Sequence, residues 1–177
     1  MPAINVKHAT VEDVHYLYNL LPEFSALHSL QDLINRLNNK ETCILVAYKD
    51  EKPVGFKLGY ALSDTTFYSW LGGVLPHSRR DGIAQVLLHT QEDWALNHGY
   101  QRIEVKTRNC FPAMLIMLIK NGYQLSELEV ADNIADNRVR LVKCLTHGTN
   151  DKWRSYNMLL AFSAPIRCDT FIGQSRR

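Results

Sequence analysis

The 177-residue sequence has no long hydrophobic run and little net charge. Its longest unbroken apolar stretch covers residues 113–119, whereas a membrane-spanning helix needs about 20 apolar residues. The N-terminal stretch MPAINVKHAT also lacks the apolar core of a signal peptide. We therefore expect a cytoplasmic protein with no membrane partner. The formal net charge of +2 is too small for the basic face of a typical nucleic-acid-binding protein.

Cysteine is scarce, and no two cysteines stand close together in the sequence. The four cysteines lie at positions 43, 110, 144 and 168 without a CxxC motif, and the seven histidines show no ligand spacing. The sequence therefore predicts neither a metal site nor a redox pair. Its hydrophobic content of 46% is enough for the core of one ordinary domain.

The apolar periodicity changes repeatedly along the chain and predicts one mixed α/β domain of the α+β type. Helical spacing predicts helices over residues 11–21, 27–37, 83–98 and 113–120. Strand patterns predict strands over residues 4–8, 43–48, 54–62, 66–74, 102–107, 123–130 and 138–145. We expect these strands to form a largely antiparallel sheet.

Three local signals add detail to this order of elements. Thr10 stands three residues before Asp13, which is the spacing of an N-cap with an acid that reaches back. Gly72 and Gly73 inside a predicted strand indicate a bulge or a close approach by another backbone or a ligand. The helix over residues 113–120 is apolar on nearly every side, which predicts burial.

The stretch VLPHSRRDGIAQVLL, residues 74–88, places two adjacent arginines at the start of a predicted helix. A helix start exposes main-chain N–H groups and carries a partial positive charge, so arginine is unfavourable there for the helix itself. Gly82 would let an anion approach those N–H groups without meeting a Cβ, and the small Ala84 keeps the first turn open. Together with Arg79 and Arg80 these features predict a pyrophosphate site. The alternative is a solvated helix start with incidental arginines.

The pattern VxPxxRxxGIA, residues 74–84, resembles the acyl-CoA signature of the GNAT superfamily of acetyltransferases. The order of predicted elements is also similar to that superfamily over residues 3–145. The resemblance implies a GNAT acyl-CoA-binding fold, in which a largely antiparallel central sheet is splayed between its fourth and fifth strands and carries helices on both faces. Residues 1–145 would form the acetyltransferase domain, and residues 146–177 a C-terminal extension.

The resemblance also implies where acetyl-CoA, the co-substrate, would bind. The main chain of Val74 and Leu75 would contact the pantetheine arm in the gap between the splayed strands. Asn109 matches an asparagine that often contacts the cofactor in relatives. The residues implied to hold the pyrophosphate form one continuous segment: Arg79, Arg80, Asp81, Gly82, Ile83 and Ala84.

The resemblance implies less about the catalytic groups. Many relatives carry a proton-donating tyrosine on the fourth helix, and Leu118 occupies that place here. Some relatives have a glutamate at the start of the strand before the motif, where this chain has Tyr68. Glu104 alternates with Lys106 on the next strand, so both should share one face, either in the acceptor cleft or in a surface ion pair. Tyr68 and Glu104 are thus the candidate catalytic residues.

The function implied is N-acetylation of a primary amine, on a small molecule or on an exposed amino group of a peptide. The alternative is a non-catalytic acyl-CoA-binding sensor or scaffold of the same fold, which the missing tyrosine favours. The extension contains the apolar run MLLAF, residues 158–162, which predicts an added or swapped strand. Exchange of that strand between two copies would give a homodimer, and a disordered remnant is the alternative.

Overall fold

The computed structural model describes residues 4–24 and 27–146, and within them the elements follow the predicted order. The strands are β1 (Ile4–His8), β2 (Thr42–Lys49), β3 (Lys52–Ser63), β4 (Thr66–Val74), β5 (Arg102–Arg108), β6 (Gln124–Glu129) and β7 (Arg138–Cys144). The helices are α1 (Val11–Asn19), α2 (Leu30–Leu37), α3 (Ile83–Asn97) and α4 (Pro112–Lys120).

The strands form one sheet in the order β1-β2-β3-β4-β5-β7-β6. Neighbouring strands pair antiparallel except β4 and β5, which run parallel. A parallel pair needs a crossover connection, and α3 provides it. The largely antiparallel sheet predicted from the sequence is confirmed.

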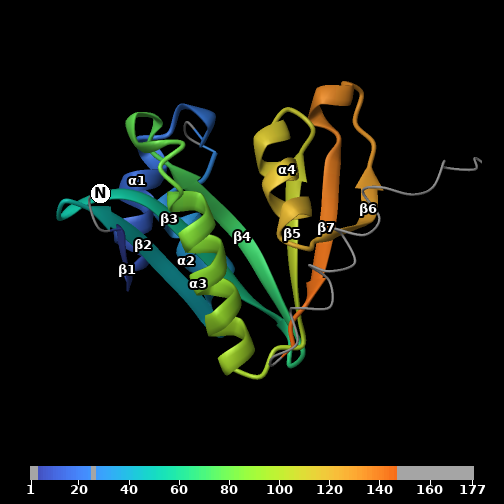
Figure 1. Ribbon diagram of the computed structural model, residues 1–177, viewed down its shortest axis with the longest axis horizontal. Helices are drawn as coiled ribbons and strands as arrows, with labels where there is room; N and C mark the ends of the chain where they lie inside the picture. Colours follow the sequence, from blue (N-terminus) through green and yellow to red (C-terminus); the bar gives the residue numbers. More distant parts are fainter. Residues whose placement is uncertain (1–3, 25–26, 147–177) are drawn as a thin grey trace, which may run out of the picture. The chain divides into compact units, whose positions relative to one another are not determined.

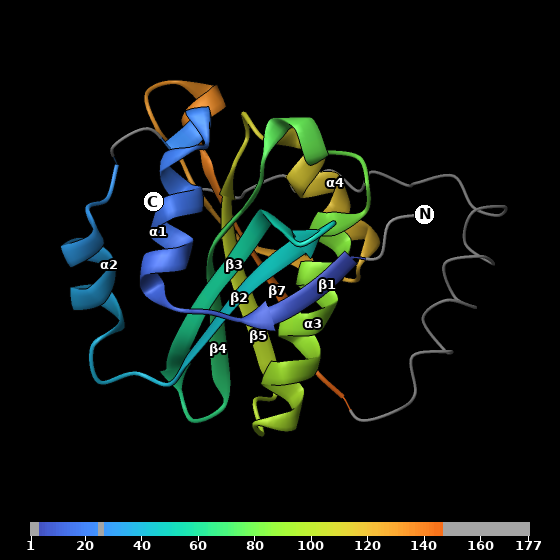
Figure 2. The ribbon, with the colours of Figure 1, turned by 90° about the vertical axis from the view of Figure 1, so that its left-hand side faces the viewer.

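Helices cover both faces of the sheet, as predicted (Figure 2). On one face, Leu17 of α1 belongs to the same buried cluster as Leu58 of β3. On the other face, Leu87 of α3 and Leu118 of α4 belong to a second cluster with Ile103 of β5. Two separate cores arise because successive residues of a strand point to opposite faces of the sheet.

The β4 and β5 strands lie side by side at one end and diverge toward the other (Figure 1). Their ladder runs only from the pair Thr66–Arg102 to the pair Ser69–Val105. Both strands continue beyond that point, and β4 is then paired on one side only, with β3. The predicted splay between the fourth and fifth strands is therefore confirmed.

A bulge in β4 lies where this ladder ends. Leu58 of β3 faces Leu71, but Gly59 faces Ser69, so Trp70 is the extra residue. A bulge bends its strand and increases the local twist, which turns the rest of β4 away from β5. The sequence suggested a bulge at Gly72 and Gly73, and the structure has it just before them, at Trp70.

Gly73 lies against a side chain, whereas the close approach predicted for the glycine pair was by another backbone or a ligand. A Cβ at Gly73 would lie 2.3 Å from Cδ1 of Leu21. The absent side chain thus lets the segment after α1 pack directly against the diverging part of β4. A substitution here would push the two elements apart.

Two details of the sequence prediction are wrong. The α2 helix begins at Leu30 rather than at residue 27, because Ser29 forms its N-cap. The α4 helix is not buried on nearly every side: Leu118 is fully buried, but Ile116 and Ile119 are 54% and 53% exposed. This helix packs on the sheet through one side, so apolar composition alone overstated its burial.

The predicted C-terminal extension, including its strand over residues 158–162, lies outside the described residues apart from residue 146. The domain boundary after residue 145, the added or swapped strand and the homodimer stay predictions.

Candidate functional site

The start of α3 is open and has no side-chain cap among the residues that the structure describes. Gly82 is the N-cap residue, with a φ of +80°, a left-handed conformation that favours glycine. A Cβ at Gly82 would meet nothing within 4 Å. Arg80 also has a positive φ, +70°, and its side chain makes no ion pair within the described ranges. The first N–H groups of α3 are thus available to an anion.

The next two residues of the predicted site divide between the core and the surface. Ile83 is 1% exposed and belongs to the core under α3, whereas Ala84 is exposed. Buried Ile83 fixes the orientation of the helix start, and small Ala84 leaves its outer side uncovered.

Two charged side chains of the predicted pyrophosphate segment form ion pairs with other residues of the chain. Arg79 Nε donates to the carbonyl oxygen of Val74 at 3.0 Å, and its guanidinium pairs with Glu23 at 2.7 Å. Asp81 Oδ2 lies 2.6 Å from Nζ of Lys49, and this hydrogen bond raises the pKa of Lys49. Arg79 therefore ties the end of β4 to the segment after α1, and Lys49 holds the Asp81 carboxylate.

The end of β4 is held by β3 through its main chain. Val74 pairs with Gly55, and the Leu75 N–H donates to the Val54 carbonyl at 2.8 Å. The Leu75 carbonyl accepts from the Ser78 N–H at 2.9 Å. Both main-chain groups of Leu75 are thus used within the chain, and the edge of β4 that no longer pairs with β5 begins earlier, at residue 70.

Asn109 connects the end of β5 to the loop before β7. Its N–H donates to the Asn137 carbonyl at 3.0 Å, and its Nδ2 donates to the Ile134 carbonyl at 3.1 Å. The residue predicted to contact the cofactor therefore also fixes the loop at the open end of the splay.

The two candidate catalytic residues lie side by side. Tyr68 and Glu104 are partners in the β4–β5 ladder, one pair before its end. The Glu104 carboxylate is 3.5 Å from Arg140 and 3.8 Å from Arg102, and its side chain is 13% exposed. Burial raises the pKa of Tyr68, so its hydroxyl keeps its proton at neutral pH. Of the two, Glu104 can accept a proton and Tyr68 can donate one.

Lys106, which was predicted to share a face with Glu104, donates a hydrogen bond to Glu129 of β6. Its partner therefore lies on β6, which is separated from β5 by β7, and the cation nearest to the Glu104 carboxylate is Arg140.

An aromatic wall beside Tyr68 escaped the sequence analysis. The Arg36 guanidinium lies 4.9 Å from the ring centre of Trp70, and Arg36 Nε donates to the Tyr60 hydroxyl at 3.0 Å. The rings of Tyr60 and Tyr68 meet edge to face, with centres 5.5 Å apart. The sequence signal that could have revealed this wall was the set of aromatic residues at alternate positions of two neighbouring strands.

Lys57 was also missed. Its side chain points into the core under α3, where it is 4% exposed, and burial lowers its pKa to about 8 although nearby Glu92 raises it. A Cβ on Gly72 would lie 3.7 Å from Lys57 Nζ, so the amine lies over the β4 backbone beyond the bulge. A lysine at an inward position of the apolar run VGFKLGY was the signal in the sequence.

A splayed parallel strand pair beside an open helix start defines the class of acyl-CoA-binding acetyltransferase domains. The model of the acetyltransferase (GNAT) family matches residues 11–123, more than half of the chain, and the chain belongs to this family. Among curated proteins, none matches this sequence closely enough to count as a relative.

Solved structures of the same family have a similar fold. The ribosomal-protein-S18-alanine N-acetyltransferase from Escherichia coli aligns with a TM-score of 0.70 at 12% identity, over 84% of this chain and 98% of that chain. A GNAT family acetyltransferase from Elizabethkingia anophelis with acetyl-CoA bound aligns with a TM-score of 0.62 at 17% identity, over 80% and 98%. A spermidine N-acetyltransferase chimera from Vibrio cholerae and hSSAT aligns with a TM-score of 0.66 at 12% identity, over 80% and 95%. At these identities the likeness shows the fold alone.

Within residues 4–24 and 27–146, no helix has the length and apolar character needed to cross a membrane. In the same ranges, no three His, Cys, Asp or Glu side chains gather where they could hold a metal ion.

Proposed function

We propose that this protein transfers an acetyl group from acetyl-CoA to a primary amine of a small molecule or a peptide. The observation that carries the proposal is the end of the β4–β5 ladder at Ser69–Val105. Beyond this pair, the half-buried main chain of β4 has hydrogen-bonding groups on its β5 side that no strand satisfies, and these groups are open to an external partner. The amide groups of a pantetheine arm are suitable partners.

The open start of α3 supports the same proposal. A pyrophosphate would be held by the N–H groups of the first turn, in the space in front of Gly82. Arg80 would add a positive charge, while the Arg79 side chain, which is already engaged, would fix the end of β4. Asn109 would contribute by holding the loop at the open end of the splay.

In the proposed reaction the amine nitrogen forms a bond to the acetyl carbon, and the carbon–sulfur bond of the thioester breaks. The amine must lose a proton to react, and Glu104 is the proposed acceptor of that proton. Tyr68 would donate a hydrogen bond from its protonated hydroxyl. The sulfur leaves as a thiolate, whose pKa of about 8.5, by analogy with cysteine, makes it an adequate leaving group without a proton donor.

The second candidate is a coenzyme-binding sensor or scaffold without turnover. One observation favours it: Leu118, fully buried in α4, occupies the place where many relatives carry a proton-donating tyrosine. Binding of coenzyme is expected in both cases, so only turnover separates the two.

Thiol release from acetyl-CoA, followed across a panel of primary amines, tests the proposal. We expect amine-dependent release from the native protein and a large loss of kcat in Glu104→Gln, with unchanged coenzyme affinity by calorimetry. Tyr68→Phe should lower kcat less. Tight coenzyme binding with no release for any amine would favour the sensor instead.

A further inference from the structure

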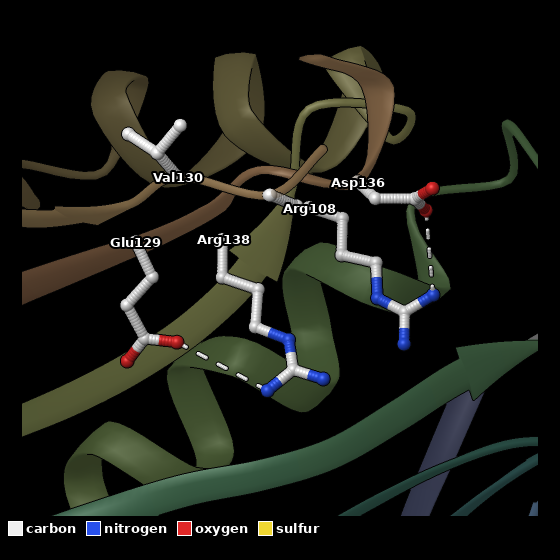
Figure 3. A pocket seen from close by; sticks show the side chains of 6 residues that line it. Arg108, Glu129, Val130, Asp136 and Arg138 are labelled. Atoms are coloured by element: carbon white, nitrogen blue, oxygen red, sulfur yellow. Dashed lines mark ion pairs between the residues drawn. The ribbon is translucent and has the colours of Figure 1, made fainter. Parts of the chain in front are cut away.

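A pocket of about 460 Å³ lies on the β5–β7–β6 half of the sheet (Figure 3). Its lining consists of Arg108, Glu129, Val130, Ala131, Asp136 and Arg138. Arg108 faces Arg138 directly across the β5–β7 ladder, and Figure 3 shows their guanidinium groups extending in the same direction. Like charges directly opposite each other destabilise a sheet. The pair is offset only in part by two long ion pairs, from Arg108 to Asp136 and from Arg138 to Glu129.

Each guanidinium makes one ion pair in the pocket, but neither pair is at hydrogen-bond distance. Arg108 Nη1 is 3.8 Å from Asp136, and Arg138 Nη1 is 4.0 Å from Glu129; both distances exceed hydrogen-bond length. Their side chains are 41% and 53% exposed. The planar donors of both arginines are thus available to a ligand, and guanidinium groups bind carboxylates in a bidentate geometry.

The two carboxylates of the pocket do not cancel its positive charge once Lys106 is counted. Lys106 donates a hydrogen bond to Glu129, and this bond lowers the pKa of Glu129. Three positive side chains, Lys106, Arg108 and Arg138, thus stand against the two carboxylates of Glu129 and Asp136. The pocket therefore favours an anion over a cation.

The pocket lies on the same face as the candidate catalytic pair. Glu104 and Arg108 are four residues apart on β5, so their side chains point the same way. Tyr68 lies directly opposite Glu104 in the β4–β5 ladder and therefore shares its face. Arg108 stands three residues beyond Val105, where the β4–β5 ladder ends, and four beyond Glu104, the proposed proton acceptor. These separations are about 10 and 13 Å along a strand.

We propose that Arg108 and Arg138 bind a carboxylate of the amine acceptor, so that the acceptor is an amine with an anionic group about 10–13 Å from its nitrogen. A peptide whose free N-terminus is followed by an acidic side chain has this chemistry, and a polyamine does not. The inference rests on the proposed function for its reaction, but the binding that it predicts can be measured without turnover.

The test compares two amidated tetrapeptides with free N-termini, Ala-Ala-Asp-Ala and Ala-Ala-Asn-Ala. Calorimetry measures their binding to the native protein with and without coenzyme A, and acetyl transfer to each is followed in parallel. We expect the acidic peptide to bind about tenfold more tightly, because it gains a hydrogen-bonded charge pair. Arg108→Gln and Arg138→Gln should each bring the two affinities close together and leave coenzyme A affinity unchanged.

Lys52→Gln is the matched control, since it removes one positive charge from an exposed position at the start of β3; it should keep the tenfold preference. Equal affinities for the two peptides, a preference that survives both arginine variants, or tighter binding of spermidine than of the acidic peptide would overturn the inference. Failure of the proposed function has a different signature: the acidic peptide still binds selectively, but no acetyl group is transferred to it.

Discussion

The starts of α1 and α2 carry capping oxygens and acidic side chains of their own, whereas the start of α3 does not. Thr10 caps α1 and Ser29 caps α2, and each forms a reciprocal capping box with an aspartate three residues on. The main-chain N–H of Ser29 donates to Asp32 at 2.8 Å and lowers its pKa. The α3 helix has neither a capping side chain among the described residues nor an acid in its first turn.

This difference favours the start of α3 over the other two as the proposed anion site. A helix start is stabilised by a capping oxygen and by nearby negative charge, and α1 and α2 satisfy both needs from their own sequence. Gly82 caps α3 without a side chain, and the preceding acid, Asp81, is paired with Lys49. The comparison therefore supports the proposed pyrophosphate site with a physical reason that is independent of family membership.

The α4 helix tests whether the lack of a cap is enough to mark a ligand-binding helix. It also lacks a side-chain cap among the described residues, but Pro112 at its first turn removes one of the N–H groups that an anion would use.

The largest effect is expected where α4 packs on the sheet. We expect Leu118→Ala to lower the free energy of unfolding by about 2–5 kcal/mol, because Leu118 is fully buried. Coenzyme affinity of the folded protein should not change.

Thermal and denaturant unfolding measure this effect, and Ile119→Ala serves as the control. Ile119 is 53% exposed, so its truncation should cost less than about 1 kcal/mol. Equal losses for the two variants would mean that α4 packs on the sheet through a different side.

The second largest effect concerns Gly82. Gly82→Val should weaken acetyl-CoA binding at least about tenfold, because a branched side chain occupies the space in front of the first N–H groups. Strain at its positive φ should also lower the free energy of unfolding by about 1–2 kcal/mol. Calorimetry on the folded variant separates the two consequences.

Gly99 at the other end of α3 provides the control for this strain. It has a φ of +87°, and a Cβ there would also meet nothing within 4 Å, so Gly99→Val should lose similar stability and keep its coenzyme affinity. If both variants lost affinity equally, backbone strain rather than the anion site would be the cause.

A smaller effect is expected at the starts of α1 and α2, which have capping side chains. Thr10→Ala and Ser29→Ala should each lower the free energy of unfolding by about 1 kcal/mol, because each removes an oxygen that accepts from a main-chain N–H. Acetyl-CoA affinity should stay at the native value. Thr10→Ser and Ser29→Thr preserve the hydroxyl and should recover most of the stability in a thermal melt; a loss of coenzyme affinity in either alanine variant would contradict the separation of roles.

The helix starts show what the sequence can predict. Thr10 with Asp13, and Gly82 with its arginines, were recognised because each signal lies within a few residues of one helix start. The bulge at Trp70 was not recognised, because it depends on the pairing of β4 with β3. The same limit applies to Gly73, whose close neighbour Leu21 is distant in the sequence.

In the candidate site, too, the sequence predicted single residues but not which of them lie side by side. Tyr68 and Glu104 were each chosen from the sequence, but their adjacency depends on the parallel register that α3 imposes on β4 and β5. The pairing of Arg108 with Arg138 arises from the β5–β7 ladder, which joins strands separated by α4 and β6. Sequence patterns report local chemistry, and the sheet decides which local features meet.

The smallest effect should appear when α3 is given the acid that α1 and α2 already have. Ala84 is exposed in the first turn of α3, and Ala84→Asp places a carboxylate beside the open N–H groups. We expect the free protein to gain about 0.3–1 kcal/mol of stability from the helix dipole. Acetyl-CoA affinity should fall about fivefold, most strongly at low salt, because the new charge repels the pyrophosphate. Ala84→Asn has nearly the same shape without the charge, and it should bind coenzyme almost as the native protein does. Opposite signs for stability and affinity would show that the two anions compete for one helix start, whereas equal affinities for the aspartate and asparagine variants would place the pyrophosphate elsewhere.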